Sequence, residues 1–210
     1  MTIPPPPAGG HHKLRLLRVP AGHAWYRVSH RRYGSALHFS KGSHARWNDP
    51  HGDYGVLYLA DRPETAFAET FGHGLMKRLP PAADKFIMLI ELQERHLYRI
   101  RSVRDLTIAL FHGPGIPALN LDARLLTTLN YQCSQAWARW TCEAPAAPAA
   151  PDGLRYSSRA LPGEGINTAL FDRCRDALTE EDLGALDIWH SDTEDLDIFD
   201  ILDTQGWGLV

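Results

Sequence analysis

Three residues between positions 46 and 69 carry side chains that would suit a single ligand. Arg46 lies in a stretch rich in turn-forming residues, Tyr58 in an apolar segment, and Glu69 in the helix predicted to follow that segment. A guanidinium presents planar donors that match phosphate oxygens, and a tyrosine ring presents a flat face to a heterocycle. A carboxylate can stabilise positive charge that develops on a sugar carbon. If the three side chains face one cleft, they would fit a nucleoside that bears phosphate.

Each of these residues also has a purely structural interpretation, which spacing alone leaves open. Arg46 could form a surface ion pair, Tyr58 could belong to the core, and Glu69 could lie on the solvated side of its helix. The choice depends on whether the strand that carries Tyr58 packs against the helix that carries Glu69.

The elements that would position these side chains follow from hydrophobic patterning and turn residues. Residues 24–28 and 54–60 predict strands, with an irregular loop over 42–52 between them. Asp61 is expected to cap a helix, with Pro63 in its first turn and Glu64 as the capping-box partner. An apolar stripe extends this helix to Met76. Further predicted elements are strands over 85–92, 97–100, 154–159 and 167–171, and a helix over 122–140. Short strands interrupted by two helices favour an α+β fold.

Several familiar catalytic arrangements are missing from the sequence. It contains no G-x-x-x-x-G-K-[ST], G-x-G-x-x-G, G-x-S-x-G or H-E-x-x-H motif, which argues against P-loop, Rossmann, α/β-hydrolase and zincin enzymes. The 11 histidines are scattered with no helical i, i+4 pair, so we expect no metal. The three cysteines have no C-x-x-C spacing and are interpreted as reduced packing residues.

Length and composition indicate one ordinary globular domain. The chain has 210 residues, of which 44% are hydrophobic and 22% charged, and no apolar run is long enough to span a membrane. Its start, MTIPPPPAGGHH, does not resemble a signal peptide, so we expect a cytoplasmic protein without membrane contact. Residues 1–12 are expected to be a disordered Pro-rich segment that buries almost nothing. Residues 13–210 are expected to form one domain.

Charge is distributed unevenly along the chain. Residues 176–203 contain 11 Asp and Glu and no Lys or Arg, whereas the remainder has 22 basic against 14 acidic residues. A basic body suits an anionic small ligand or a nucleic acid. The acidic segment, in which residues 195–202 alternate acidic and apolar types, is interpreted as an edge strand or a partner-contact surface that could dock near the basic cleft. Simple solubility is an equal alternative.

Four stretches together resemble the RES-domain family. They are Trp25-Tyr26-Arg27-Val28, Ala45-Arg46-Trp47-Asn48, residues 56–60 with Ala66-Phe67-Ala68-Glu69, and Asp152 to Arg159 (DGLRYSSR). The likeness covers roughly residues 16–173. It implies a fold related to ADP-ribosyltransferases, with a split, twisted β-sheet core and flanking helices. It also implies the toxin half of a bacterial toxin–antitoxin pair, with NAD as substrate.

The resemblance assigns a role to each matching residue. Arg27 and Arg46 match the arginines that hold NAD, Tyr58 the tyrosine at the cleft, and Glu69 the catalytic glutamate. The serine has two candidates: Ser158, in the tyrosine-x-serine-arginine pattern, and Ser134, at a second polar position found in some members. Ala45 stands where glycine is more common. Alanine is tolerated wherever φ is negative, so only the loop geometry is affected.

The resemblance further implies an enzyme that cleaves the bond between nicotinamide and ribose, by hydrolysis or phosphorolysis. Transfer of ADP-ribose to a protein and a catalytically inactive interaction module remain alternatives. The implied partner is an antitoxin, usually with a helix-turn-helix, which blocks the active site and would be the only link to DNA.

Overall fold

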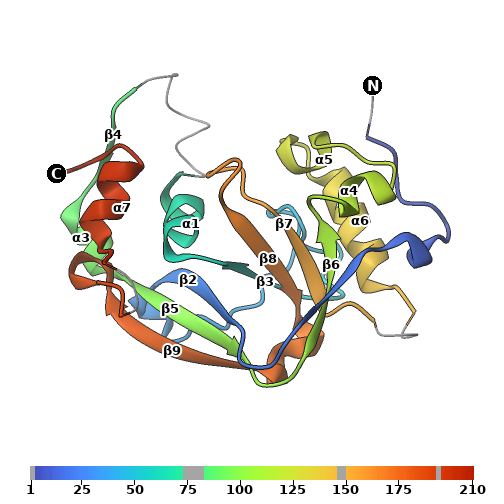
Figure 1. Ribbon diagram of the computed structural model, residues 1–210, viewed down its shortest axis with the longest axis horizontal. Coiled ribbons are helices and arrows are strands. Elements are labelled where there is room, and N and C mark those ends of the chain that lie inside the picture. Colours follow the sequence, from blue (N-terminus) through green and yellow to red (C-terminus); the bar gives the residue numbers. More distant parts are fainter. Residues whose placement is uncertain (1–2, 73–82, 146–149, 193–194) are drawn as a thin grey trace.

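The computed structural model describes residues 3–72, 83–145, 150–192 and 195–210. Eight strands form one strongly twisted sheet in the order β1-β6-β7-β8-β3-β2-β5-β9, and β10 and β4 pair in a small second sheet (Figure 1). In the large sheet all neighbours are antiparallel except β6 and β7. The expected α+β class is confirmed.

The element bounds are as follows. The strands are β1 (Leu16–Val19), β2 (Ala24–His30), β3 (Val56–Ala60), β4 (Lys85–Ile87), β5 (Arg95–Ser102), β6 (Leu106–Phe111), β7 (Gly153–Ser157), β8 (Ile166–Phe171), β9 (Leu178–Ala185) and β10 (Trp207–Leu209). The α-helices are α1 (Pro63–Phe67), α3 (Leu89–Gln93), α4 (Gly115–Ala118), α5 (Arg124–Thr127), α6 (Gln132–Cys142) and α7 (Ile198–Thr204). Short 3₁₀ turns in the described part of the chain lie at His11–Lys13, Arg31–Tyr33, Asp172–Ala177 and Leu186–Ile188, and a π-helical turn, η3, lies at Ala68–Gly72.

The large sheet splits between β2 and β3. These strands share a single register pair, Tyr26 with Ala60, whereas β2 pairs with β5 along its whole length and β3 does the same with β8. Because backbone pairing holds neighbouring strands about 4.8 Å apart, strands without it are free to diverge. The expected split sheet is therefore present, and its opening lies at the strands predicted to carry Arg27 and Tyr58.

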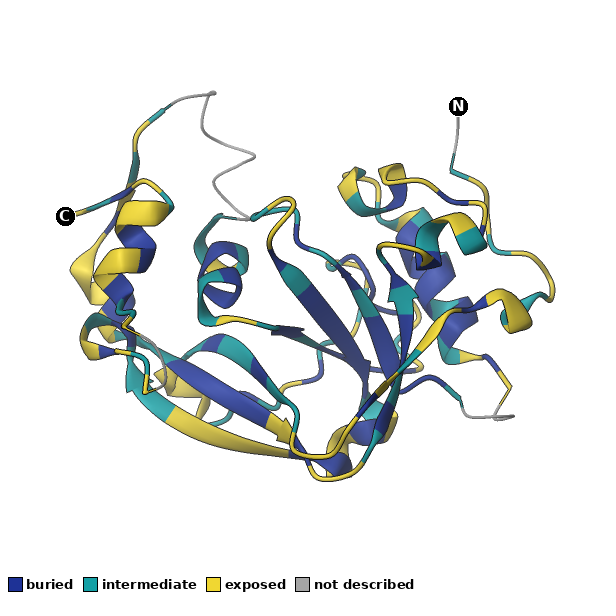
Figure 2. Cartoon of the chain, viewed as in Figure 1, coloured by how far each residue is buried: buried dark blue, intermediate teal, exposed yellow. Residues whose placement is uncertain are grey.

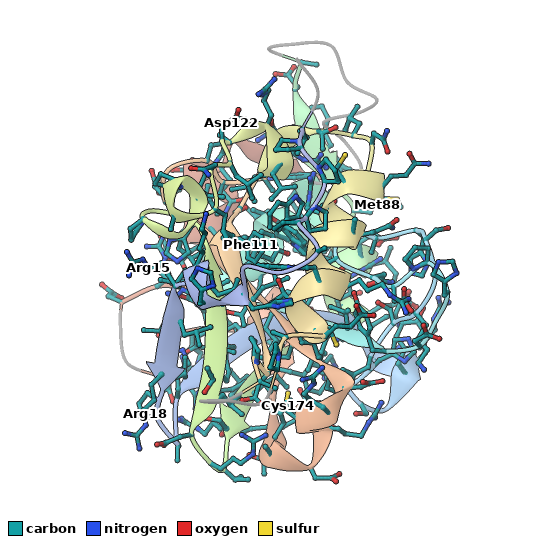
Figure 3. The ribbon with its side chains drawn as sticks, turned by 90° about the vertical axis from the view of Figure 1, so that its right-hand side faces the viewer. Arg15, Arg18, Met88, Phe111, Asp122 and Cys174 are labelled. Carbon is teal, nitrogen blue, oxygen red and sulfur yellow. The ribbon has the colours of Figure 1, made fainter. Side chains whose placement is uncertain are left out.

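Helices cover the sheet on two sides. The parallel connection from β6 to β7 contains α4, α5 and α6, because a parallel pair needs a long crossover. Trp137 of α6 packs against the buried Phe111 of β6. Viewed from that side, Phe111 lies in the middle of the packed side chains, and Arg15 and Arg18 lie at the edge near β1 (Figure 3). On the opposite side α3, α7 and the β4–β10 pair enclose a separate apolar cluster. The central strands β3 and β8 are the most buried part of the sheet (Figure 2).

Most predicted strands are present, and the differences have local causes. The predictions over 24–28, 54–60, 97–100, 154–159 and 167–171 correspond to β2, β3, β5, β7 and β8. The helix predicted over 122–140 is interrupted between α5 and α6, where the side chains of Thr128 and Asn130 accept bonds from backbone N–H groups. Such bonds compete with helical ones. The strand predicted over 85–92 is only β4, and α3 follows it.

The acidic segment differs from its predicted form. The edge strand is β9, and residues 198–204 form α7. Asp197 accepts bonds from the backbone N–H groups of Phe199 and Asp200, and the Asp200 side chain accepts one from the Asp197 N–H. This capping box favours a helix. The acidic segment therefore contains the expected edge strand, as β9, but its alternating end at 195–202 does not extend that strand.

The Pro-rich start of the chain makes defined contacts with α6. The Trp137 indole donates to the Pro4 carbonyl (3.0 Å), and the His11 ring stacks on Trp140 with centroids 4.1 Å apart. Ile3 packs against the same apolar cluster. None of residues 3–12 is itself buried, although these contacts hold the segment against α6. Residues 1 and 2 lie outside the described residues.

Asp61 does not cap the helix as predicted. The helix begins after Arg62, which makes no side-chain cap bond, and the Asp61 carboxylate instead forms an ion pair with Arg155 of β7. The α-helix itself ends at Phe67 and continues as the π-helical turn η3 to Gly72. The rest of the predicted helix, to Met76, lies outside the described residues.

Two histidines, His23 and His112, lie beside this ion pair and predict a loss of stability in acid. Burial lowers the pKa of both imidazoles from 6.5. The folded protein therefore binds fewer protons than the unfolded chain as the pH falls below about 6.5, and stability decreases until the imidazoles charge. The pKa of Asp61, raised by burial, offsets part of this loss at lower pH. Melting temperatures between pH 7 and 5 should fall in the wild type and depend less on pH in a His23→Gln, His112→Gln variant. Equal slopes would contradict this assignment.

Candidate active site

A cavity of about 380 Å³ opens where the sheet splits. β2 and β3 line it on both sides of the split, α1 and η3 add the segment that follows β3, and the 44–46 loop and β7 close it. Arg27, Arg46, Tyr58 and Glu69 all border it. Segments distant in the sequence therefore meet at one cavity, as the sequence predicted for Arg46, Tyr58 and Glu69.

Glu69 is held by two side chains from other elements. Its Oε1 accepts hydrogen bonds from the Ser158 hydroxyl (2.6 Å) and from the Asn167 amide (2.8 Å). The carboxylate lies in η3, and single π-helical turns of this kind are frequent at functional sites. Because β7 leads directly to Ser158 and Asn167 lies in β8, the sheet itself fixes the orientation of the Glu69 carboxylate.

Tyr58 is fixed through its hydroxyl. The oxygen accepts a bond from the Trp47 backbone N–H (2.9 Å), and the hydroxyl donates to the fully buried Asn48 side chain (2.9 Å). Burial raises the pKa of Tyr58 well above its usual value, so the ring is neutral at physiological pH. The hydroxyl thus ties β3 to the loop that carries Arg46 and holds the ring at the cavity wall.

Arg46 is nearly buried and cross-links its loop to α5. Its guanidinium donates to the carbonyls of Leu125 (2.9 Å) and Thr128 (3.0 Å), and it lies 4.9 Å from the centre of the Tyr131 ring. Burial, followed by the nearby charge of Arg159, lowers the pKa of Arg46, but an arginine stays protonated in a protein. With partners of this kind, the guanidinium is not a surface ion pair but a fixed positive charge at the cavity.

Arg27 borders the cavity from β2 and turns towards another loop. Its guanidinium donates to the carbonyls of Ala36 (2.9 Å) and His38 (3.2 Å). Burial lowers the pKa of Arg27 to about 10, against an opposing effect of Glu180, so the side chain is still cationic at neutral pH. The charges that act on Arg46 include Glu69 and Arg159, whereas the charge that acts on Arg27 is Glu180. Of the two arginines, Arg46 is therefore the one that interacts with the charged groups of the cavity.

The two candidate serines occupy different places. Ser158 is buried against Glu69, and its oxygen also accepts the Leu161 N–H (2.9 Å). Gly165 leaves room for it, since a Cβ there would lie 2.7 Å from the Ser158 Cβ. Ser134 is fully buried in α6, where its hydroxyl donates to the Tyr131 carbonyl (3.0 Å). Neither serine lines the cavity itself, but Ser158 bonds to Glu69, which does.

These positions predict opposite effects for two matched substitutions. Ser158→Ala removes the hydroxyl that donates to Glu69 and is expected to lower turnover by roughly tenfold, which corresponds to about 1.4 kcal/mol. Ser134→Ala removes a local helix bond and should cost about 1 kcal/mol of stability at most, with turnover unchanged. Steady-state kinetics and thermal unfolding of both variants check this prediction. Equal losses of turnover would contradict it.

Several cavity residues were not predicted from the sequence as site residues. Arg159 and Tyr156 belong to the 152–159 stretch, and Tyr131 is the N-cap residue of α6. Asn167 was interpreted only as the start of a strand. The available signal for Asn167 was an amide side chain near the start of a largely buried strand.

The described residues contain no group of three or more His, Cys, Asp or Glu side chains that could hold a metal ion. No helix in these described ranges has the length and apolar character needed to cross a membrane. The cavity instead combines guanidinium groups, aromatic rings and one anchored carboxylate. This combination can bind an anionic ligand and stabilise positive charge next to it.

Comparisons with known proteins give one family match and a solved structure with a similar fold. The model of the RES domain family matches residues 24–197. Among solved structures, one chain of the crystal structure of the M. tuberculosis MbcT–MbcA toxin–antitoxin complex aligns with a TM-score of 0.50 and 16% sequence identity. The alignment covers 80% of this chain and 87% of that chain, which shows a common fold. A comparison with curated proteins gives no significant match.

Proposed function

The chain belongs to the RES domain family, and we propose on this basis that it cleaves NAD at the bond between nicotinamide and ribose. The observation that carries the proposal is the meeting of Arg46, Tyr58 and Glu69 at one cavity, with Glu69 held through Oε1 by two donors. These are the three kinds of group that a dinucleotide with a positively charged base needs.

Each side chain has a defined part in the proposed reaction. Arg46, with Arg27 at the border of the cavity, neutralises the pyrophosphate, and Tyr58 stacks on the nicotinamide ring. When the glycosidic C–N bond breaks, its electron pair passes to the pyridinium nitrogen and positive charge develops on the ribose. Glu69 stabilises that charge, which is greatest in the transition state.

Ser158 acts through Glu69 in this scheme. Its only hydroxyl proton is donated to the Glu69 carboxylate, and its oxygen accepts the Leu161 N–H. The hydroxyl therefore cannot donate to a ribose hydroxyl at the same time. We therefore assign Ser158 to positioning of the Glu69 carboxylate and not to a hydrogen bond with the ribose. Ser134 has no part in the scheme.

We further propose that the protein is the toxin of a toxin–antitoxin pair that acts in the cytoplasm. The similar fold occurs in a chain of a toxin–antitoxin complex, which supports an antitoxin partner. That partner would carry a helix-turn-helix, cover the NAD cavity, and provide the only contact with DNA.

The experiment is to incubate the purified protein with NAD and to quantify nicotinamide, ADP-ribose and phosphorylated ADP-ribose. Nicotinamide with ADP-ribose indicates water as acceptor, and a phosphate-dependent product indicates phosphorolysis. Labelling of an added protein extract by radioactive NAD would instead indicate ADP-ribosyl transfer. Release of no nicotinamide under any of these conditions would leave the interaction module as the remaining function.

A further inference from the structure

The sheet that carries the Glu69 site has a second polar cluster on its reverse face. Strand register shows the two faces: Tyr156, Asn167 and Ala60 are successive cross-strand partners and border the cavity. The neighbouring partners Arg155, Thr168 and Leu59 therefore share the opposite face, because successive side chains of a strand alternate. Asp61 follows Ala60 and pairs with Arg155 on that face.

This ion pair spans β8 and joins two segments that meet again at Glu69. Arg155 lies in β7, three positions before Ser158, and Asp61 lies directly before the turn into α1 and η3. The Asp61 backbone N–H also donates to the carbonyl of Ile166 (3.0 Å), the residue before Asn167. From behind, the ion pair thus ties the segment that leads to η3 to β7, and the Asp61 backbone bond adds β8.

The pair is half-buried and lies next to polar side chains. Asp61 and Arg155 side chains are 19% and 20% exposed, and the charged or titratable groups that act on Asp61 are Arg155, His23 and His112. His23 packs edge-on against Trp25, whose indole donates to Thr168 of β8 (3.2 Å). A buried ion pair of this kind is poor evidence for stability as such, so a positional role explains it better.

We propose that Asp61 and Arg155 are positioning residues for Glu69, and that their ion pair sets the spacing between the segment that carries Glu69 and the strands that present Ser158 and Asn167. Its effect on turnover rests on the proposed cleavage of NAD, whereas its effect on the Glu69–Asn167 bond does not. Misplacement of a catalytic group by about 1 Å can cost about 10²-fold in rate. Loss of the pair should therefore lower kcat and leave KM for NAD nearly unchanged.

The test uses the double variant Asp61→Asn, Arg155→Met, which removes both charges and leaves neither one buried alone. Arg155→Lys, which keeps the cation, is the conservative variant. Arg104→Met is the matched control, because it breaks an Arg–Asp pair with Asp152 at the other end of β7 (2.8 Å). We expect kcat of the double variant to fall by about 10- to 100-fold with KM within about threefold. Arg155→Lys should be intermediate, and Arg104→Met should lower only the melting temperature.

A second readout is independent of turnover. The Asn167 side-chain amide donates to Glu69, so its NMR resonances should shift towards those of a solvated amide in the double variant and stay in place in Arg104→Met. Wild-type kcat together with unchanged Asn167 resonances in the folded double variant would overturn the proposal. If the wild type releases no nicotinamide, the proposed function fails and the Asn167 resonances alone decide the positional role.

Discussion

Replacement of Glu69 by Gln is expected to lower the rate of nicotinamide release by about 10²-fold or more while NAD still binds with nearly unchanged affinity. A glutamine has the same shape, and its amide oxygen can still accept the bonds from Ser158 and Asn167 that reach Oε1. The substitution removes the negative charge and keeps an acceptor for these two bonds. That charge matters most when the ribose becomes positive, so the loss should appear in kcat.

Single-turnover kinetics and calorimetric titration of NAD measure the two effects separately. Glu164→Gln is the matched control, since Glu164 is an exposed carboxylate (73% side-chain exposure) in the loop before β8, and its turnover should equal that of the wild type. Weaker NAD binding with unchanged turnover in Glu69→Gln would show that the carboxylate serves in binding and not in catalysis.

Replacement of Arg46 by Lys is expected to reduce kcat/KM for NAD by roughly 10- to 100-fold, since a hydrogen bond to a charged group is worth about 1.5–3 kcal/mol. Lysine keeps the charge but not the planar fork. One ammonium cannot reach the Leu125 and Thr128 carbonyls, stack on Tyr131 and face a pyrophosphate together. The melting temperature should also fall, because the loop loses its tie to α5.

Arg27→Lys serves as the comparison for Arg46→Lys. The Arg27 guanidinium contacts the 36–38 loop, so we expect a smaller loss, of about tenfold or less. Titration of NAD into both variants checks the order. A larger loss in Arg27→Lys would show that the pyrophosphate lies against β2, and the assignment of Arg46 as the central cation would be wrong.

Local patterning predicted the elements that build the site. Residues 24–28 and 54–60 have the composition of strands, and β2 and β3 lie at these positions. The sequence order of Arg46, Tyr58 and Glu69 was informative because each lies on a different element that adjoins the same split. Their convergence follows from one feature, the nearly unpaired β2–β3 boundary.

What could not be predicted depends on partners distant in the sequence. Asp61 has the spacing of a helix cap, but a guanidinium 94 residues away competes successfully for its carboxylate. Ser158 and Ser134 both matched the resemblance, and only the fold shows that one reaches Glu69 and the other its own helix. Residues 195–202 have strand-like alternation, but the Asp197 and Asp200 side chains bond to the backbone and favour a helix.

The most direct test of the account is a crystal structure of the Glu69→Gln variant with NAD bound. The account predicts the nicotinamide ring against Tyr58, the glycosidic carbon next to residue 69, and the pyrophosphate within hydrogen-bond distance of Arg46. NAD bound elsewhere on the protein, or bound in this cavity with its adenine in place of nicotinamide beside residue 69, would contradict it.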